Sequence, residues 1–485
     1  MAESFGNFIA GEWTRTLSGK TFESMNPANT DEVVALYQAS VLEDVQAAFS
    51  AASRAQPAWA STPAPLRGTV FLKAAELLDR RAEGVAKEMT REEGKTLPEA
   101  KGEVARAVNI FRFFGGEGAR LCGETVPSER PEVFAFTFRK PLEVVSLLTP
   151  WNFPIAIPAW KMAPALVAGN SLVIKPASLA PLCTVRLVEC LSEAGLPKGV
   201  LNLVTGSGSA LGDELIENLA VRAVSFTGSC QVGRSIQRKT TSKGIKTQLE
   251  MGGKNPTIVL KDADLSKAAD IVVNAAFFST GQKCTATSRA IIEEPIYEEF
   301  LKLLAEKARQ LKVGNGLEPG VEMGPCVDEN QMNTVLNYIE LGKKEGARLL
   351  CGGSRLSGPA YDKGYFVEPT IFTDVRPEMR IAQEEIFGPV LAVLPACDFE
   401  EALQIANNVE LGLSASLLTQ QLDKVFAYIN RIEAGLIIVN LPSAGVEYQL
   451  PFGGTKNSSS GFREQGSVAI DFYSELRTVY LKHSL

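Results

Sequence analysis

The stretch PLEVVSLLTPWNFPIAIPAWKMAPALVAGNSLVIKP (141–176) contains one complete strand–helix–strand unit. LEVVSLL (142–148) predicts a buried strand, and TPWNFP (149–154) predicts a turn-rich loop. A helix through KMAPALVAG (161–169) and a second apolar strand, SLVIKP (171–176), follow. Strands joined by a crossover helix lie parallel in one sheet.

The same alternation continues on the C-terminal side of this unit. Strands alternating with helices of about 10–15 residues are typical of a parallel, doubly wound α/β sheet. A second alternating set is expected from about 262 to 440. The first set continues with a helix at 181–194, strands at 201–206 and 222–229, a helix from 230, and strands at 247–253 and 256–260.

The segments before and after this α/β region have different sequence patterns. Residues 1–60 predict short strands and turns, whereas 63–118 have the three- and four-residue apolar spacing of helices packed on a larger body. The tail ELRTVYL (475–481) alternates like an exposed edge strand, which could pair with another subunit.

Composition limits the class of protein. The 485 residues are 45% hydrophobic and 22% charged, which is typical of a soluble globular protein of several domains. No apolar run reaches the ~18 residues of a membrane helix, and the N-terminus does not resemble a signal peptide. A net charge of −7 without a basic stripe argues against nucleic acid as a partner. Eight scattered cysteines without a CxxC pair favour the reducing cytoplasm and argue against a zinc site.

The chain has one histidine, His483. Its place beside the C-terminus argues strongly against a Ser-His-Asp or Cys-His enzyme, and a single histidine rules out a metal site built on two imidazoles. No metal is expected. A catalytic base in this chain must be a carboxylate, a lysine or water.

Three residues are candidates for chemistry. Cys284 lies in the small, polar window STGQKCTATSR (279–289), which favours an accessible thiol over an inert one. Glu250 in QLEMGGKNP (248–256) ends a predicted strand, where a carboxylate faces either a cleft or solvent. Asn152 follows another strand and either donates to an oxyanion or forms a turn.

Two glycine-rich turns could hold a phosphate. Each follows a predicted strand, and backbone N–H groups at the start of the next helix suit a pyrophosphate. A tight strand-to-helix turn explains the glycines equally well. The turns are VTGSGSALG, with Gly206, Gly208 and Gly212, and FTGSCQVG, with Gly228, Ser229 and Gly233.

Together these segments resemble the aldehyde dehydrogenase superfamily. TPWNFP, VIKPAS, FTGS, LEMGGKNP, GQKCTATSR, EEIFGP and PFGG occur in that family's order over essentially the whole chain. The resemblance implies an α/β fold with a Rossmann-like dinucleotide-binding domain (1–122 and 144–253) and an α/β catalytic domain (254–445). A small β oligomerisation element (123–143 and 466–485) would join subunits into a homodimer or homotetramer.

The resemblance also implies catalytic roles. Cys284 matches the nucleophile, which forms a thiohemiacetal and then a thioester with a small-molecule aldehyde. The Asn152 amide and the Cys284 backbone N–H match the oxyanion donors. Glu250 matches the base that activates water, which argues against a CoA-acylating relative. Lys161 matches a lysine near the site.

NADP or NAD is the implied cofactor. At Ser178, NAD-specific members often carry a glutamate that would repel a 2′-phosphate, so we expect NADP+ to be accepted. Lys175 matches the lysine at the adenosine ribose. The other residues that match cofactor-binding positions are Thr149, Pro150, Trp151, Gly208, Gly212, Phe226, Gly228, Ser229, Gly252, Glu385 and Phe387.

The substrate is inferred from longer segments. STGQKCTATSR, SAGVEYQLPFGG and TKNSSSGFREQG are most similar to bacterial family members that oxidise α-ketoglutaric semialdehyde (2,5-dioxopentanoate) to 2-oxoglutarate. Trp160 stands where succinic semialdehyde enzymes usually have arginine. Lys283, Arg289 or Ser443 could contact the substrate anion, although each could also be structural. Succinic semialdehyde, broader aliphatic or aromatic aldehydes, and a non-catalytic relative remain alternatives.

Overall fold

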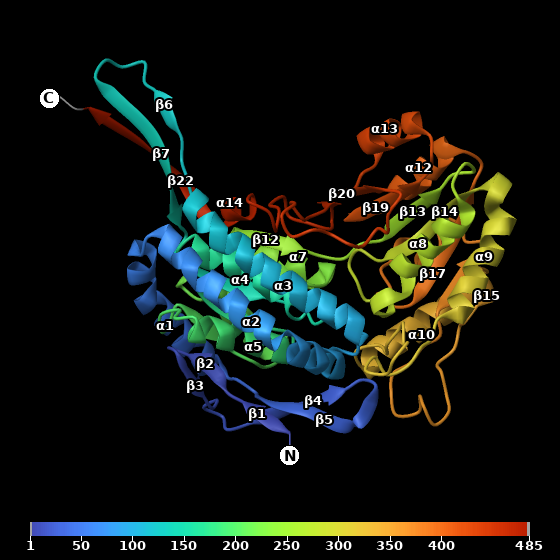
Figure 1. The fold of residues 1–485 in the computed structure, drawn as a ribbon, viewed down its shortest axis with the longest axis horizontal. Coiled ribbons are helices and arrows are strands. Elements are labelled where there is room, and N and C mark those ends of the chain that lie inside the picture. The colour runs from blue at the N-terminus through green and yellow to red at the C-terminus, as the bar shows by residue number, and fades with distance from the viewer. Residues whose placement is uncertain (1, 483–485) are drawn as a thin grey trace.

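The computed structural model describes residues 2–482. The last three residues of the expected oligomerisation element, 483–485, lie outside the described part, and His483 is one of them. A seven-stranded sheet forms the centre of the first lobe, in the order β12-β11-β8-β9-β10-β2-β3 (Figure 1). Its first five strands are parallel, which confirms the predicted doubly wound sheet. The strands are β2 (Asn7–Ile9), β3 (Glu12–Thr14), β8 (Val144–Leu148), β9 (Ser171–Lys175), β10 (Leu201–Leu203), β11 (Val221–Thr227) and β12 (Lys246–Glu250).

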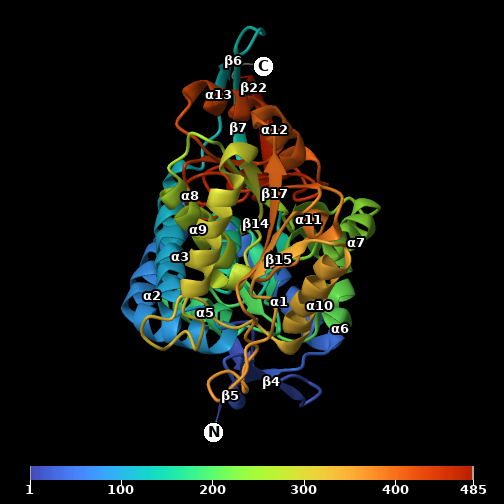
Figure 2. The ribbon, with the colours of Figure 1, turned by 90° about the vertical axis from the view of Figure 1, so that its right-hand side faces the viewer.

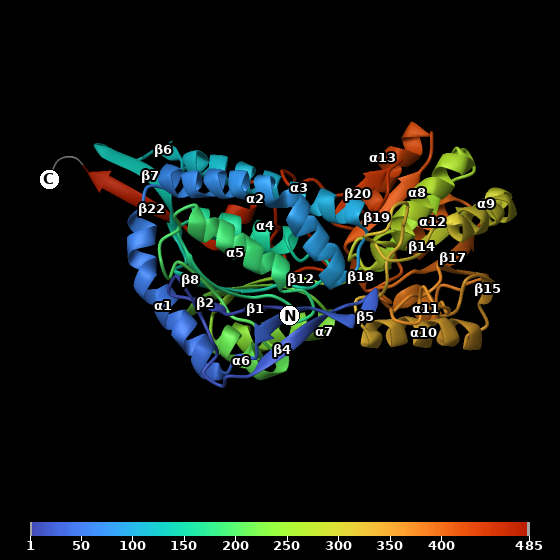
Figure 3. The ribbon, with the colours of Figure 1, turned by 60° about the horizontal axis from the view of Figure 1, so that its bottom comes forward.

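Helices cover both faces of this sheet (Figure 3). On one face α4 and α5 contact the strands and are backed by α2 and α3, and on the other face lie α1, α6 and α7. The helices are α1 (Leu42–Ser61), α2 (Ala64–Glu93), α3 (Leu97–Glu117), α4 (Ala156–Val167), α5 (Leu182–Glu193), α6 (Gly208–Glu217) and α7 (Cys230–Thr241).

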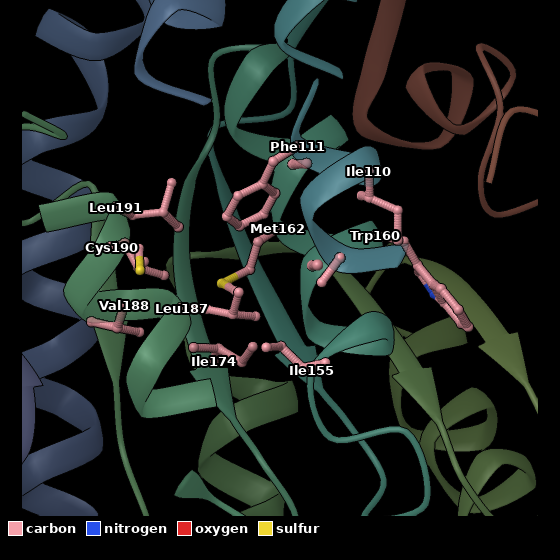
Figure 4. Close-up of a cluster of buried hydrophobic side chains, with 14 of the residues drawn as sticks. Ile110, Phe111, Ile155, Trp160, Met162, Ile174, Leu187, Val188, Cys190 and Leu191 are labelled. Atoms are coloured by element: carbon pink, nitrogen blue, oxygen red, sulfur yellow. The ribbon is translucent and has the colours of Figure 1, made fainter. Parts of the chain in front are cut away.

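Helix α4 is buried along its whole length. It is enclosed by β8 and β9 on one side and α3 on the other, so every one of its positions is removed from water. In Figure 4, Met162 of α4 lies between Phe111 of α3 and Leu187 of α5. This packing fixes the loop before α4, which contains Asn152.

A second seven-stranded sheet forms the other lobe, in the order β15-β16-β17-β14-β13-β19-β20 (Figure 2). Only the β15–β16 pair is antiparallel. The strands are β13 (Asn255–Val259), β14 (Thr287–Glu293), β15 (Arg348–Cys351), β16 (Thr370–Thr373), β17 (Val390–Ala396), β19 (Ser414–Leu418) and β20 (Leu436–Val439). The helices are α8 (Leu265–Phe277), α9 (Tyr297–Gln310), α10 (Glu329–Lys344), α11 (Arg380–Gln383), α12 (Phe399–Asn407) and α13 (Leu422–Arg431).

An antiparallel arm projects away from both lobes (Figure 1). It consists of β6 (Thr125–Pro127), β7 (Val133–Pro141) and β22 (Ser474–Lys482), in the order β22-β7-β6. Strand β22 is therefore an edge strand, which confirms the prediction made from the alternation at 475–481. The arm joins two segments that are more than 300 residues apart in the chain.

Smaller elements complete the described residues, and two of the expectations for them were wrong. Residues 42–60 were expected as strands and turns, but they form α1. The Asp44 carboxylate in the first turn of this helix accepts the backbone N–H of Val41, the N-cap residue, at 2.9 Å. The strand at 256–260 was expected in the first set, but it is β13 of the second sheet. No helix within 2–482 is both long and apolar enough to cross a membrane. The remaining elements are β1 (Glu3–Phe5), β4 (Thr21–Asn26), β5 (Asn29–Gln38), β18 (Leu411–Gly412), β21 (Thr455–Lys456) and α14 (Ala469–Tyr473).

Candidate active site

Cys284 follows a tight turn between α8 and β14. Three successive residues before it, Ser279, Thr280 and Gly281, have φ values of 54°, 57° and 64°. Left-handed conformations at non-glycine residues cost free energy and persist only where the surroundings hold them. Glu99 of α3 holds this turn, because its Oε1 accepts the Ser279 N–H at 2.6 Å.

The glycines of LEMGGKNP allow that segment to lie against the Cys284 loop. Asn255 Nδ2 donates to the Cys284 carbonyl at 2.7 Å. A Cβ atom on Gly253 would lie 2.6 Å from the same carbonyl oxygen, which is too close for any side chain. The two motifs that identify the site in the sequence are therefore in direct contact.

Glu250 ends β12 and is almost completely buried. Its Oε2 accepts a hydrogen bond from Ser459, and within residues 2–482 its Oε1 has no hydrogen-bond partner. Burial and the neighbouring Glu464 raise the pKa of Glu250 well above its usual value. One carboxylate oxygen is thus fixed while the other is available to a water molecule.

Asn152 lies in the loop between β8 and α4. Its carbonyl accepts from Lys95 Nζ at 2.7 Å, and its Nδ2 donates to the Gln282 carbonyl at 2.9 Å. A side-chain amide has two N–H donors, so one remains for another acceptor. The loop that carries the amide is thereby fixed on both sides.

Two cavities meet at Cys284. The larger, of about 450 Å³, contains Glu250 in its lining, and the smaller, of about 280 Å³, contains Asn152. The residues that line both are Ile157, Thr227, Met251 and Cys284. A thiol at this junction can react with a molecule in one cavity while a second molecule occupies the other. Burial, with Glu385 and Glu250 nearby, raises the pKa of this thiol to about 12.

The smaller cavity gathers residues that the sequence associates with the cofactor. The Trp151 and Phe387 rings meet edge to face at 5.4 Å, and Glu385 Oε1 accepts the Gly253 N–H at 3.0 Å. Burial raises the pKa of Glu385 to about 7. A Cβ atom on Gly252 would lie 2.0 Å from the Glu385 carboxylate. The predicted cofactor residues in this lining are Pro150, Trp151, Gly228, Ser229, Gly252, Glu385 and Phe387.

The residues expected at the adenosine end meet at the Gly206 carbonyl. Lys175 Nζ donates to it at 3.2 Å and Ser178 Oγ at 2.8 Å. Gly208 and Gly212 lie in α6, and a Cβ atom on either would meet nothing within 4 Å. These two glycines border open space rather than the smaller cavity.

Two further cofactor candidates lie at the ends of neighbouring strands. The Phe226 ring lies under the turn before α7, since a Cβ atom on Gly228 would be 2.5 Å from its Cζ. Thr149 Oγ1 is buried without a partner in the described chain. The Val232 N–H is capped by Ser229 Oγ, and within residues 2–482 the N–H groups of Cys230 and Gln231 at the start of α7 have no partner. With them, the donors and rings around the smaller cavity fit a nicotinamide dinucleotide.

Lys161 lines neither cavity. It is fully buried, donates to Ser225 Oγ at 2.7 Å and forms an ion pair with Glu464. The Trp160 indole donates to the other Glu464 oxygen at 2.7 Å. The structure therefore puts Lys161 behind Glu250, in contact with a carboxylate that sequence reasoning missed.

Of the three residues considered for the substrate anion, only Lys283 lines the larger cavity. The Arg289 guanidinium is buried, donates to the carbonyls of Lys254, Ile405 and Ala406 at 2.9–3.0 Å, and lines neither cavity. Ser443 Oγ is likewise buried and donates to the Thr285 carbonyl at 2.8 Å. Neither residue lines the larger cavity, so the geometry favours Lys283 among the three.

Sequence reasoning missed several residues that hold or line the site. Asn255 lies within a motif that was recognised, so its position could have been noted. Lys95, Glu99 and Arg106 carry no local signal, because a helix face that lines a cavity looks like any other amphipathic face.

Comparison with known proteins agrees with this geometry. Residues 13–479 match the family model described as "Aldehyde dehydrogenase family". The chain is 50% identical to the alpha-ketoglutaric semialdehyde dehydrogenase of Bacillus subtilis over 98% of each chain. It is 48% identical to the alpha-ketoglutarate semialdehyde dehydrogenase of Haloferax volcanii over 99% of each. A solved betaine aldehyde dehydrogenase from Staphylococcus aureus in complex with NAD+ superposes with a TM-score of 0.96 at 34% identity, covering 99% of this chain and 95% of that one.

Proposed function

Because this chain belongs to the aldehyde dehydrogenase family and is an NAD(P)+-dependent aldehyde-oxidising enzyme, we propose that its substrate is α-ketoglutaric semialdehyde and its product 2-oxoglutarate. The observation that carries the proposal is the position of Cys284 at the meeting point of two cavities, with Glu250 in one and Asn152 in the other. The names of the two relatives support the choice of aldehyde.

In the first half of the proposed reaction, the Cys284 thiol loses its proton to water, and the thiolate attacks the aldehyde carbon to form a thiohemiacetal oxyanion. The free N–H of Asn152 and the backbone N–H of Cys284 stabilise the oxyanion, and one such donor is worth about 3–4 kcal/mol. The dinucleotide, when bound, supplies the hydride acceptor. Loss of hydride leaves a thioester on Cys284.

In the second half, Glu250 acts on water. Its unpartnered Oε1 takes a proton as the water oxygen attacks the thioester carbon, which releases the carboxylic acid and the thiolate. Ser459 fixes the other oxygen, so the carboxylate cannot rotate freely. The positive charge of Lys161 behind the carboxylate opposes the rise in the Glu250 pKa.

The dinucleotide would extend from the smaller cavity to the Gly206 carbonyl. Trp151, Glu385 and Phe387 would hold the nicotinamide end, and Lys175 with Ser178 the adenosine ribose. Gly228 and Ser229 at the start of α7 would hold the pyrophosphate.

Replacing Ser178 by glutamate should lower kcat/KM with NADP+ by about tenfold or more, because a carboxylate beside Lys175 repels a 2′-phosphate. NAD+ lacks that phosphate, so its kcat/KM serves as the internal control and should change little. Steady-state rates with both dinucleotides measure the effect. Equal values of kcat/KM with NADP+ for variant and wild type would refute the proposed role of Ser178.

The walls of the larger cavity suit a short aldehyde with an anionic end. Phe153, Trp160 and Phe452 supply apolar surface. Lys283 supplies a positive charge, and burial lowers the pKa of its amine to about 8. An anion bound beside it would favour the charged form.

Ranking kcat/KM across aldehydes tests the proposed substrate. α-Ketoglutaric semialdehyde should exceed succinic semialdehyde, and both should exceed uncharged pentanal. Highest kcat/KM for pentanal or an aromatic aldehyde would favour a broad-specificity enzyme instead. Absence of aldehyde-dependent NAD(P)H would favour a non-catalytic relative, and a requirement for CoA would favour acyl transfer.

We also propose the division into a dinucleotide-binding domain (1–122 and 144–253), a catalytic domain (254–445) and an oligomerisation element. Each of the first two ranges is built on one of the two large sheets. Cytoplasmic location is proposed because all eight cysteines are free thiols.

The arm supports the proposed homodimer or homotetramer. Within residues 2–482, strand β22 pairs along one edge only. Leu476 and Tyr480 on this strand are more than half exposed, and Leu481 is 49% exposed. Exposed apolar side chains on a free strand edge are typical of a subunit interface. Replacing Leu476 and Tyr480 by aspartate should convert the assembly to monomers in sedimentation velocity. An active monomer in the wild type would contradict the proposal.

A further inference from the structure

The face of α3 that points toward Cys284 carries three charged side chains. Glu99, Glu103 and Arg106 follow one another at intervals of four and three residues, so they lie on one side of the helix. All three line the larger cavity. This face therefore determines much of the charge that a substrate meets there.

Both carboxylates of this face are already engaged. Glu99 Oε1 accepts the Ser279 N–H before the nucleophile. Glu103 Oε1 accepts two backbone N–H groups at the start of α4, at 3.1 Å each, and its Oε2 pairs with Lys95. Their negative charges are compensated within the protein and would not hold a substrate cation.

Arg106 is the exception on this face. Within residues 2–482 its guanidinium forms no hydrogen bond and no ion pair. Burial lowers the pKa of Arg106, and the charges of Glu103 and Glu447 oppose that change. An arginine remains protonated under such conditions. A half-buried, charged guanidinium with five unused N–H donors thus faces the cavity.

A second unpaired cation, Lys283, lines the same cavity next to Cys284 in the chain. Carboxylates lie near both cations, Glu103 and Glu447 near Arg106 and Glu99 near Lys283. Within residues 2–482 none of them forms a hydrogen bond or an ion pair with either cation, so both keep their N–H donors for a bound anion. Of the two, only the guanidinium has the planar fork that matches a carboxylate with two parallel hydrogen bonds.

We propose that Arg106 is the specificity-determining residue of this enzyme, binding the carboxylate of the substrate while the aldehyde carbon lies at Cys284 Sγ. The inference rests on the proposed function, because it assigns a second contact for the substrate in the same cavity. An uncharged aldehyde leaves the guanidinium without a partner, so the site selects against it.

Kinetics of Arg106→Met test the assignment. Methionine keeps the length and flexibility of the side chain but removes the charge. We expect kcat/KM for α-ketoglutaric semialdehyde to fall about 100-fold, mainly through KM, while kcat/KM for pentanal stays within about threefold. Arg106→Lys should recover part of the loss. Lys101→Met is the matched control, since Lys101 is exposed on α3 and lines no cavity, and it should behave as wild type.

A second variant that is expected to gain activity distinguishes lost substrate binding from misfolding. Arg106→Asp should raise kcat/KM for 4-trimethylaminobutanal, whose positive charge is permanent, above the wild-type value. A damaged fold cannot produce that reversal of preference.

Three results would overturn the inference. Arg106→Met could leave kcat/KM for α-ketoglutaric semialdehyde unchanged, or it could lower kcat/KM for the semialdehyde and for pentanal by the same factor. Arg106→Asp could fail to raise kcat/KM for 4-trimethylaminobutanal. A wild-type enzyme that prefers pentanal is a separate result, because it contradicts the proposed function before any variant is made.

Discussion

Replacing Cys284 by alanine is expected to lower aldehyde-dependent NAD(P)H formation by about 10⁴-fold or more, because no other thiol lies at the junction of the two cavities. The oxyanion donors and the dinucleotide-binding residues remain, so the dinucleotide should bind with unchanged affinity. Loss of the rate with retained binding separates chemistry from folding.

The matched control for this variant is Cys397→Ala. Cys397 is exposed, follows β17 and is absent from the linings of both cavities. It should keep the full rate. Retention of more than about a tenth of the wild-type rate by Cys284→Ala would mean that another group forms the covalent bond.

Glu250→Gln should accumulate the thioester. Glutamine keeps the size and the Ser459 contact but cannot take a proton from water, so the steady-state rate should fall by about 10²–10⁴-fold. The first turnover does not need that base, so one equivalent of NAD(P)H should still form in a burst. Rapid-mixing absorbance measures both phases, and Cys284→Ala should show no burst.

The pH dependence gives a second readout for Glu250. Its pKa is raised by burial, and only the deprotonated form acts as a base, so hydrolysis in the wild type should increase with pH as the carboxyl ionises. Glu250→Gln should lack that increase. Because the pKa of Cys284 is also raised, the burst rate should increase with pH in both enzymes. A wild-type hydrolysis rate that falls with pH would contradict the role of Glu250.

The sequence predicts the sheets well because parallel strands buried on both faces are short apolar runs separated by helices. The unit at 141–176 illustrates this, since its two strands are β8 and β9 and its helix is α4. Helix α1 was missed because short strands and turns precede it and because it contains Pro57, which favours a turn.

The three central residues of the site could be predicted for a different reason. Local sequence made Cys284, Glu250 and Asn152 candidates, and the resemblance to the aldehyde dehydrogenase family gave each of them a role. Their supports could not be predicted in this way. Glu99 reaches the turn before Cys284 across about 180 residues of chain, and Glu464 reaches Lys161 across about 300.

The substrate residues were the least predictable. Arg289 and Ser443 are close in sequence or motif to the site, but their donors are used by backbone carbonyls. Arg106 has no motif around it, and only the path of α3 along the cavity reveals it. Proximity in sequence to the nucleophile is thus a poor guide to the residues that line the larger cavity.

The central claim is that Cys284 carries an acyl group which Glu250 helps water to remove. Peptide mass mapping of Glu250→Gln, quenched in acid after mixing with α-ketoglutaric semialdehyde and NAD(P)+, tests it most directly. The account predicts that the peptide containing Cys284 gains the mass of 2-oxoglutaric acid less one water, and that no other cysteine peptide does. An unmodified Cys284 peptide after a full burst of NAD(P)H would contradict it.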